Sequence, residues 1–117
     1  MPLKSDLANW SAALPVTIRD LIHRVLQNGV DTEAGLRTAA FEHAAQTGEA
    51  SSLPHELRPW LTKVAVHSYK TLDRDVDALR KACYSDGAIF ELTVAAALGA
   101  GALRCKSGLE ALEEALR

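Results

Sequence analysis

The segment from Ile89 to Leu103 constrains the fold of this chain more than any other part of its sequence. It reads IFELTVAAALGAGAL, and Glu91 is its only charged residue. Apolar side chains fall on nearly every side of a helix of this sequence, which predicts a helix that is covered all round. A chain of 117 residues has few other helices with which to surround it. We therefore expect a homo-oligomer, with the small residues Ala95, Gly99 and Gly101 close to the subunit interface.

The rest of the chain also shows apolar residues at helical spacing. Aromatic residues make up only 5% of the sequence, and alanine and leucine supply most of its apolar content, which favours packed helices over a sheet. We predict an all-α fold, a single domain over residues 1–117 with about five to six helices. The apolar stripes that precede the central helix contain Ile18, Leu21, Ile22, Val25 and Leu26, then Leu36, Ala40 and Ala44, then Leu57, Trp60, Leu61, Val64 and Ala65, then Leu72, Val76, Leu79 and Cys83.

Several residues mark where these helices begin and end. Helix starts are predicted at Asp31 or Thr32, Pro54, Thr71 or Asp73, and Ser85, and helix ends at Gly29 and Gly48. The pattern from Ser107 to Glu110 is typical of a capping box and indicates a separate last helix. Equally, the central helix can run on through Leu109, Leu112 and Leu116.

Charge and cysteine content indicate a soluble, cytoplasmic protein. The net charge is −2 and no helix collects basic residues, so we expect no binding to nucleic acid. The first ten residues lack the apolar core of a signal peptide. The longest nearly uncharged run, residues 92–103, is shorter than the ~20 residues that cross a bilayer. The two cysteines, Cys83 and Cys105, fit a reducing compartment and are read as small apolar residues in packing.

Two motifs in the C-terminal half point to a known family. They are the turn CYSD at residues 83–86 and the helix IFELTVAAALGAG that follows it. Through them, residues 53–116 resemble the alkylhydroperoxidase D-like, or carboxymuconolactone decarboxylase, superfamily. The resemblance implies an all-α fold and assembly into dimers, trimers or larger rings. In its peroxidase branch it also implies a Cys-x-x-Cys redox pair, a histidine four residues after the second cysteine, and a glutamate on the preceding helix that assists in proton relay.

This chain departs from the peroxidase motif of that family. With Cys83 in the place of the family's glycine, Ser68 and Thr71 fall at the two cysteines and Asp75 falls at the histidine. Glu56 falls at the relay glutamate. Serine and threonine cannot form a disulfide, and an unassisted hydroxyl is a poor nucleophile. We therefore expect no thiol-dependent peroxidase activity.

Three other residues are candidates for acid–base chemistry near Ser68, namely Glu56, His67 and Glu91. His67 either caps the end of its helix or acts as an acid or base. Glu91 is either a carboxylate that the helix dipole favours, or a partly buried one whose pKa is raised and which faces His67 or Arg104.

A bound metal is not predicted. The acidic residues at positions 73, 75 and 77 are read as helix-end electrostatics, because they alternate around a helix and cannot all face one ion. The four histidines show no metal-ligand spacing. No cofactor is predicted either.

Two functions remain open at this point. The preferred hypothesis is a non-peroxidatic homo-oligomer with a binding or structural role, which can include a small-molecule ligand. The alternative is an acid–base enzyme of the carboxymuconolactone decarboxylase type, acting on a small organic acid or lactone.

Overall fold

A computed structural model describes residues 10, 12–47, 53–67 and 73–117. These residues form five α-helices and one short 3₁₀ helix, which confirms the prediction of a small all-α bundle. The elements are α2 (Val16–Gln27), α3 (Ala34–Ala45), η2 (His55–Leu57), α4 (Arg58–Val66), α5 (Asp73–Lys81) and α6 (Asp86–Ala115).

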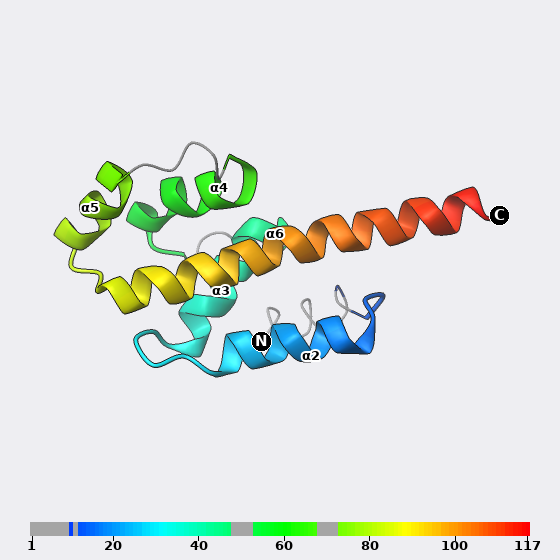
Figure 1. Cartoon of the computed structure of the whole chain (residues 1–117), viewed down its shortest axis with the longest axis horizontal. Coiled ribbons are helices and arrows are strands. Elements are labelled where there is room, and N and C mark those ends of the chain that lie inside the picture. Colours follow the sequence, from blue (N-terminus) through cyan, green and yellow to red (C-terminus); the bar gives the residue numbers. More distant parts are fainter. Residues whose placement is uncertain (1–9, 11, 48–52, 68–72) are drawn as a thin grey trace.

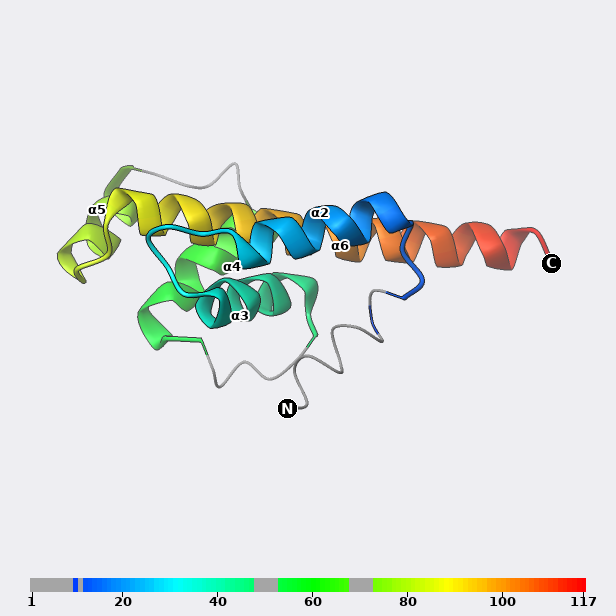
Figure 2. The ribbon, with the colours of Figure 1, turned by 90° about the horizontal axis from the view of Figure 1, so that it is seen from below.

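The 30-residue helix α6 organises the molecule. It runs along the longest axis, with α4 and α5 on one side and α2 on the other, and it crosses in front of α3 (Figure 1). The perpendicular view shows α3 beneath the layer that contains α2 and α6 (Figure 2). The C-terminal part of α6 extends beyond the other helices in both views, which explains the elongated shape of 52 × 31 × 24 Å.

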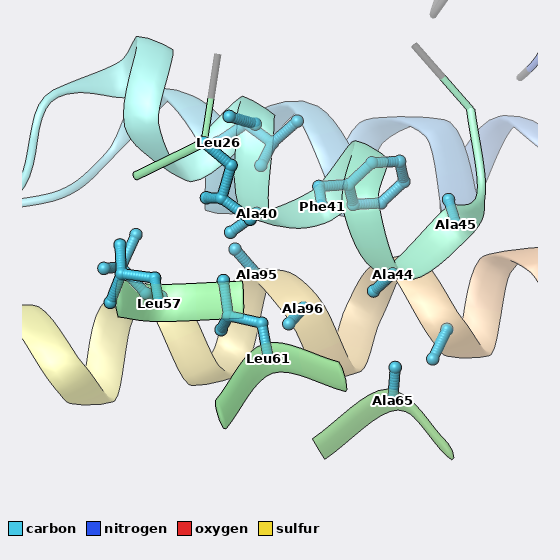
Figure 3. Packing of buried hydrophobic residues seen from close by; sticks show 14 of the residues in the cluster. Leu26, Ala40, Phe41, Ala44, Ala45, Leu57, Leu61, Ala65, Ala95 and Ala96 are labelled. Carbon is cyan, nitrogen blue, oxygen red and sulfur yellow. The ribbon is translucent and has the colours of Figure 1, made fainter. Parts of the chain in front are cut away.

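The core lies where α3 and α4 meet the first half of α6. Alanines at this contact let the helices approach closely, as Figure 3 shows for Ala95, which points toward Ala40 of α3. Larger side chains fill the space around the alanines, and Phe41, Leu57, Leu61 and Leu92 are fully buried. The sequence stripes therefore identify the core, because Ala40, Ala44, Leu57, Leu61 and Ala65 all belong to it.

Gly99 is the point of closest approach between α3 and α6. A Cβ atom added there would collide with the backbone carbonyl of Phe41. Ala95 is also fully buried inside the chain. These two residues thus contact α3 and not a second subunit, and a helix of the same chain explains their small size. Gly101 faces the other way, and a Cβ atom there would meet nothing within 4 Å.

Within the described chain α6 is covered on only part of its surface, so cover of its outer side by a second subunit stays a prediction. Phe90 is 69% exposed, and Ala97 and Gly101 are exposed on the same outer side. The helix also continues through the predicted capping box at Ser107 without a break. Beyond that point Leu112 is exposed, because no described helix lies beside this part of α6.

The length of α6 also weakens one argument from the sequence. By length and composition alone, α6 is long and apolar enough to cross a membrane, a property that the core helices of soluble proteins share. The uncharged run is short, but the helix extends well beyond it. A soluble, cytoplasmic location stays a prediction.

The ends of the helices agree with the sequence only in part. Ser85 caps α6 as predicted, since its Oγ accepts a 3.0 Å hydrogen bond from the amide of Ala88. The predicted cap of α3 at Asp31 or Thr32 is wrong, because Glu33 occupies the N-cap position. Asp73 is the first residue of α5 and not its cap. The predictions at Gly48, Thr71 and Leu72 lie outside the described residues.

Cys83 lies just after α5, not in its apolar stripe. It is exposed and adopts a left-handed backbone conformation with φ of 73°. The amide of Tyr84 bonds back to the carbonyl of Leu79, which is the arrangement of a helix that ends on a left-handed residue. Glycine is the usual residue at such a position. Cys105, by contrast, packs against the core as expected.

Replacing Gly99 with alanine should destabilise the protein. Overpacking costs about 1–3 kcal/mol, and a clash with a backbone carbonyl lies in the upper part of that range, at about 2–3 kcal/mol. The gain in helix propensity returns roughly 1 kcal/mol, so we expect a net loss of ~1–2 kcal/mol in the free energy of unfolding. Gly108→Ala is the matched control in the same helix, because nothing lies within 4 Å of its added Cβ atom. Urea denaturation should show the control to be neutral or stabilised. An unchanged Gly99→Ala variant would contradict the close contact.

Replacing Cys83 with glycine should stabilise the protein by about 0.5–1 kcal/mol. The left-handed conformation costs a residue with a Cβ atom roughly 1–2 kcal/mol, and glycine escapes that cost at the expense of some chain entropy. Cys83→Ala, which removes the thiol but keeps the Cβ atom, should change little. The two variants are compared by thermal unfolding, and equal melting temperatures would count against the strained turn.

Candidate functional site

The three predicted acid–base residues do not meet in one site. Glu56 lies in η2, His67 is the exposed C-cap of α4, and Glu91 lies near the start of α6. Glu56 and Glu91 line two different hollows. Ser68 and Thr71, the positions of the missing redox pair, lie outside the described residues.

Glu91 holds the loop between α2 and α3. Its carboxylate accepts hydrogen bonds from the amides of Val30 (2.7 Å) and Asp31 (3.0 Å) and from the hydroxyl of Thr32 (2.6 Å). The guanidinium of Arg37 lies 3.9 Å away and is almost completely buried. Arg37 donates in turn to the carbonyl of Leu26 (3.0 Å) and to Thr32.

This network corrects the functional hypothesis for Glu91. Hydrogen bonds from Thr32 and from the amides of Asp31 and Val30 lower the pKa of Glu91 to about 2, whereas the hypothesis needed a raised pKa. Arg104 does not reach this carboxylate and donates to the carbonyl of Ala65 at 2.8 Å. Glu91 is a structural anchor that ties α6 to the loop after α2.

A second cluster of polar residues surrounds a cavity of about 170 Å³ between α4 and α5. Lys63 of α4 binds both carboxylate oxygens of Asp75 of α5, at 3.1 and 3.0 Å. Glu56 lies on the same cavity. The described residues that line it are Glu56, Pro59, Trp60, Lys63, Asp75, Ala78 and Leu79.

Two hydrogen bonds from neighbouring elements hold this cavity in shape. The indole Nε1 of Trp60 donates to the hydroxyl of Thr93 on α6 at 2.9 Å, and that hydroxyl donates to the carbonyl of Ile89 at 2.6 Å. The hydroxyl of Tyr84 donates to Glu56 at 2.8 Å. The ring of Trp60 and the carboxylate of Glu56 are therefore fixed before any ligand arrives.

The electrostatics of the cavity suit binding better than proton transfer. Bonds from its own backbone amide and from Tyr84 lower the pKa of Glu56, so that it stays ionised near neutral pH and is a weak base. Burial and the bond to Glu56 raise the pKa of Tyr84 to about 12, so that it keeps its proton. Asp75 is engaged with Lys63.

Sequence reasoning placed Glu56 and Asp75 only through the family resemblance and missed Lys63 altogether. A signal was present, because Glu56, Trp60 and Lys63 are spaced by four and three residues and fall on one side of a helix. Trp60 was interpreted as a core residue, and in the structure it is partly buried against the core. Nothing in the sequence could reveal that Asp75, beyond the next turn, pairs with Lys63.

Two of the three acidic residues of α5 enter ion pairs. Asp75 binds Lys63, and Asp77 binds Arg80 at 2.9 Å. Within residues 10, 12–47, 53–67 and 73–117, no three histidine, cysteine or acidic side chains are grouped so as to hold a metal ion.

Comparison of the chain with models of known protein families, with curated proteins and with solved structures found no match.

Replacing Glu91 with glutamine should lower the melting temperature at pH 7. It should also make the melting temperature fall less steeply as the pH is lowered. The folded-state pKa is about 2 and the ordinary value is 4.5, so the stability that Glu91 contributes is present above pH 4.5 and is lost as the pH falls toward 2. Thermal unfolding is measured at intervals from pH 7 to pH 2. Glu110→Gln, at an exposed pair with Lys106, serves as the control. Parallel curves for the Glu91 variant and the unmodified protein would rule out the anchor.

Proposed function

We propose that this protein is a non-peroxidatic, homo-oligomeric protein of the alkylhydroperoxidase D-like type that binds a small organic molecule between α4 and α5. The observation that carries the proposal is the cavity lined by Glu56, Trp60, Lys63 and Asp75. It combines an aromatic wall with a few polar groups that converge on one space, which is the usual composition of a small-molecule site.

The family resemblance also supports the cavity between α4 and α5 as the binding site. Glu56 and Asp75 correspond to the relay glutamate and the histidine of the peroxidase motif, and both line this cavity although nineteen residues separate them in sequence. The aspartate at the histidine position is paired with Lys63, so it does not replace a histidine that moves protons. A binding role keeps the place of the family's site without its redox chemistry.

Size and charge restrict the ligand. A volume of about 170 Å³ is below the roughly 300–1,000 Å³ of drug-sized sites and close to the ~150 Å³ cavity known to hold benzene. Among the described residues, two carboxylates and one ammonium group line the cavity, so this part of its lining has a negative formal charge. We infer a ligand of about one ring that is neutral or cationic.

The alternative function, an acid–base enzyme of the carboxymuconolactone decarboxylase type, has less support. A carboxylate base works best when its pKa is near the working pH, and the pKa values of Glu56 and Glu91 are both lowered. The charge of the cavity also opposes an organic acid, so that a neutral lactone is the substrate class that fits this alternative.

Three ring compounds of similar size test the proposal: benzylamine, benzyl alcohol and benzoate at pH 7. Binding is followed by the fluorescence of Trp60 in a Trp10→Phe background. We expect the amine to bind most tightly and benzoate most weakly. Glu56→Gln should weaken binding of the amine severalfold, because it removes one of the two carboxylates that line the described part of the cavity, whereas Glu110→Gln should not.

Two outcomes would contradict this function. A preference for benzoate would overturn the charge argument, and no response to any of the three compounds would remove the support for a binding site. Dithiol-dependent consumption of peroxide by the same preparation would show that the protein is a peroxidase after all.

A further inference from the structure

The outer face of α6 carries apolar and small residues that no described element covers. We define this outer face by Phe90, Val94, Ala97 and Gly101, which follow one another at spacings of four, three and four residues. Phe90, Ala97 and Gly101 are exposed, and Val94 is half-buried. Figure 1 shows α6 from the front, with the other helices beside it or behind it.

A projecting side chain and a residue that has no side chain lie toward opposite ends of this face. Phe90 projects with 69% of its surface exposed, whereas a Cβ atom at Gly101 would meet nothing within 4 Å. Eleven residues, or about 16 Å of helix, separate them. Gly101 lowers helix stability by roughly 1 kcal/mol relative to alanine, and no contact within the described chain requires a glycine there, in contrast to Gly99.

We propose that a second copy of this chain occupies the outer face, with the two α6 helices antiparallel about a two-fold axis near residues 95–96. Phe90 of each copy then lies over Gly101 of the other, and Val94 lies against Ala97. Such a contact is isologous, which means that the same surface of both copies forms it and that each pair of residues occurs twice. This inference rests on the homo-oligomeric part of the proposed function and not on its ligand.

Charge complementarity selects this register. The same pairing brings Asp86, whose side chain is 72% exposed and binds Arg80 of its own chain at 2.7 Å, close to Arg104 of the other copy at both ends of the contact. Shifting the helices by about two turns so that Phe90 meets Gly108 instead would place Arg104 against Val94, which buries a charge among apolar atoms. In a parallel arrangement each charged residue would lie beside the identical residue of the other copy, so that like charges would meet.

The neighbouring helix α2 widens the contact. Val25 of α2 lines a hollow together with Phe90 and Val94, and Leu21, one turn earlier, is 46% exposed. Residues 86–105 span about 30 Å, and two helices side by side are about 20 Å wide, so each copy offers roughly 600 Å². The total of about 1,200 Å² is at the lower end of stable protein interfaces, which predicts a dimer that dissociates on dilution.

Light scattering at concentrations from micromolar to millimolar tests the dimer, whose mass should approach twice 12.6 kDa. Gly101→Leu should raise the dissociation constant at least tenfold while the monomer stays folded, because the added side chain enters open space. Gly108→Leu is the matched control: it is equally open, on the same side of α6 and outside the proposed contact, so it should leave the dimer intact.

Cysteine crosslinking tests the register in a Cys83→Gly, Cys105→Ser background. A mixture of Phe90→Cys protein with Gly101→Cys protein should form a disulfide-linked heterodimer on mild oxidation. Either variant alone should not, because its two copies of the cysteine would lie about 16 Å apart along the helices and a disulfide needs Cα atoms within ~7 Å.

The outcomes separate the claims. If the Gly101→Leu variant still forms an oligomer and no mixed crosslink appears, the proposed pairing of the α6 helices is wrong but the homo-oligomeric state stands. A 12.6 kDa species at every concentration overturns both, and the same monomer co-sedimenting with phosphatidylglycerol vesicles would assign the outer face to lipid. The response of Trp60 to benzylamine is a separate measurement, which tests the ligand cavity whichever of these outcomes is found.

Discussion

The close approach of α6 to α3 is the contact on which the rest of the structure depends. It exists because Gly99 leaves room for the carbonyl of Phe41, and because alanines occupy the neighbouring positions on both helices. With the two helices this close, the large residues Leu57 and Leu61 can be buried from the side of α4. The packing of α4 against α6 in turn helps to position the cavity between α4 and α5.

Long-range polar contacts then fix what the apolar packing leaves free. Glu91 connects α6 to a loop sixty residues earlier in the chain, and the buried Arg37 links the same loop to the end of α2. On the other side of the molecule Trp60 connects α4 to α6. Helices rich in alanine offer few distinctive shapes for their partners to recognise, and these directional bonds supply a unique arrangement that close packing of small residues alone would not.

The sequence predicts what is local and fails where distant residues decide. The helical stripes and the Ser85 cap depend on residues within a few positions of one another, and the structure confirms the cap and most described members of the stripes, with Leu21 and Cys83 as exposed exceptions. Thr32 looks like a helix cap in sequence, but its hydroxyl binds Glu91 instead. Glu91 looked like a candidate acid for the same reason, because the amides that lower its pKa belong to a loop about sixty residues earlier in the sequence. Lys63 and Asp75 could be paired only once the fold had placed α5 beside α4.

The hydrogen bond between Trp60 and Thr93 has a thermodynamic consequence. Thr93 lies one turn from Phe90 and Ala97 on α6, while the ring that it holds forms a wall of the ligand cavity. If α6 pairs with a second copy, occupancy of the cavity and association of the chains share this bond and are linked equilibria. Linkage is reciprocal, so a ligand that favours one position of Trp60 would change the association constant by the same factor by which association changes ligand affinity. Apparent ligand affinity would then vary with protein concentration, and its independence of concentration would show that the bond only supports the fold.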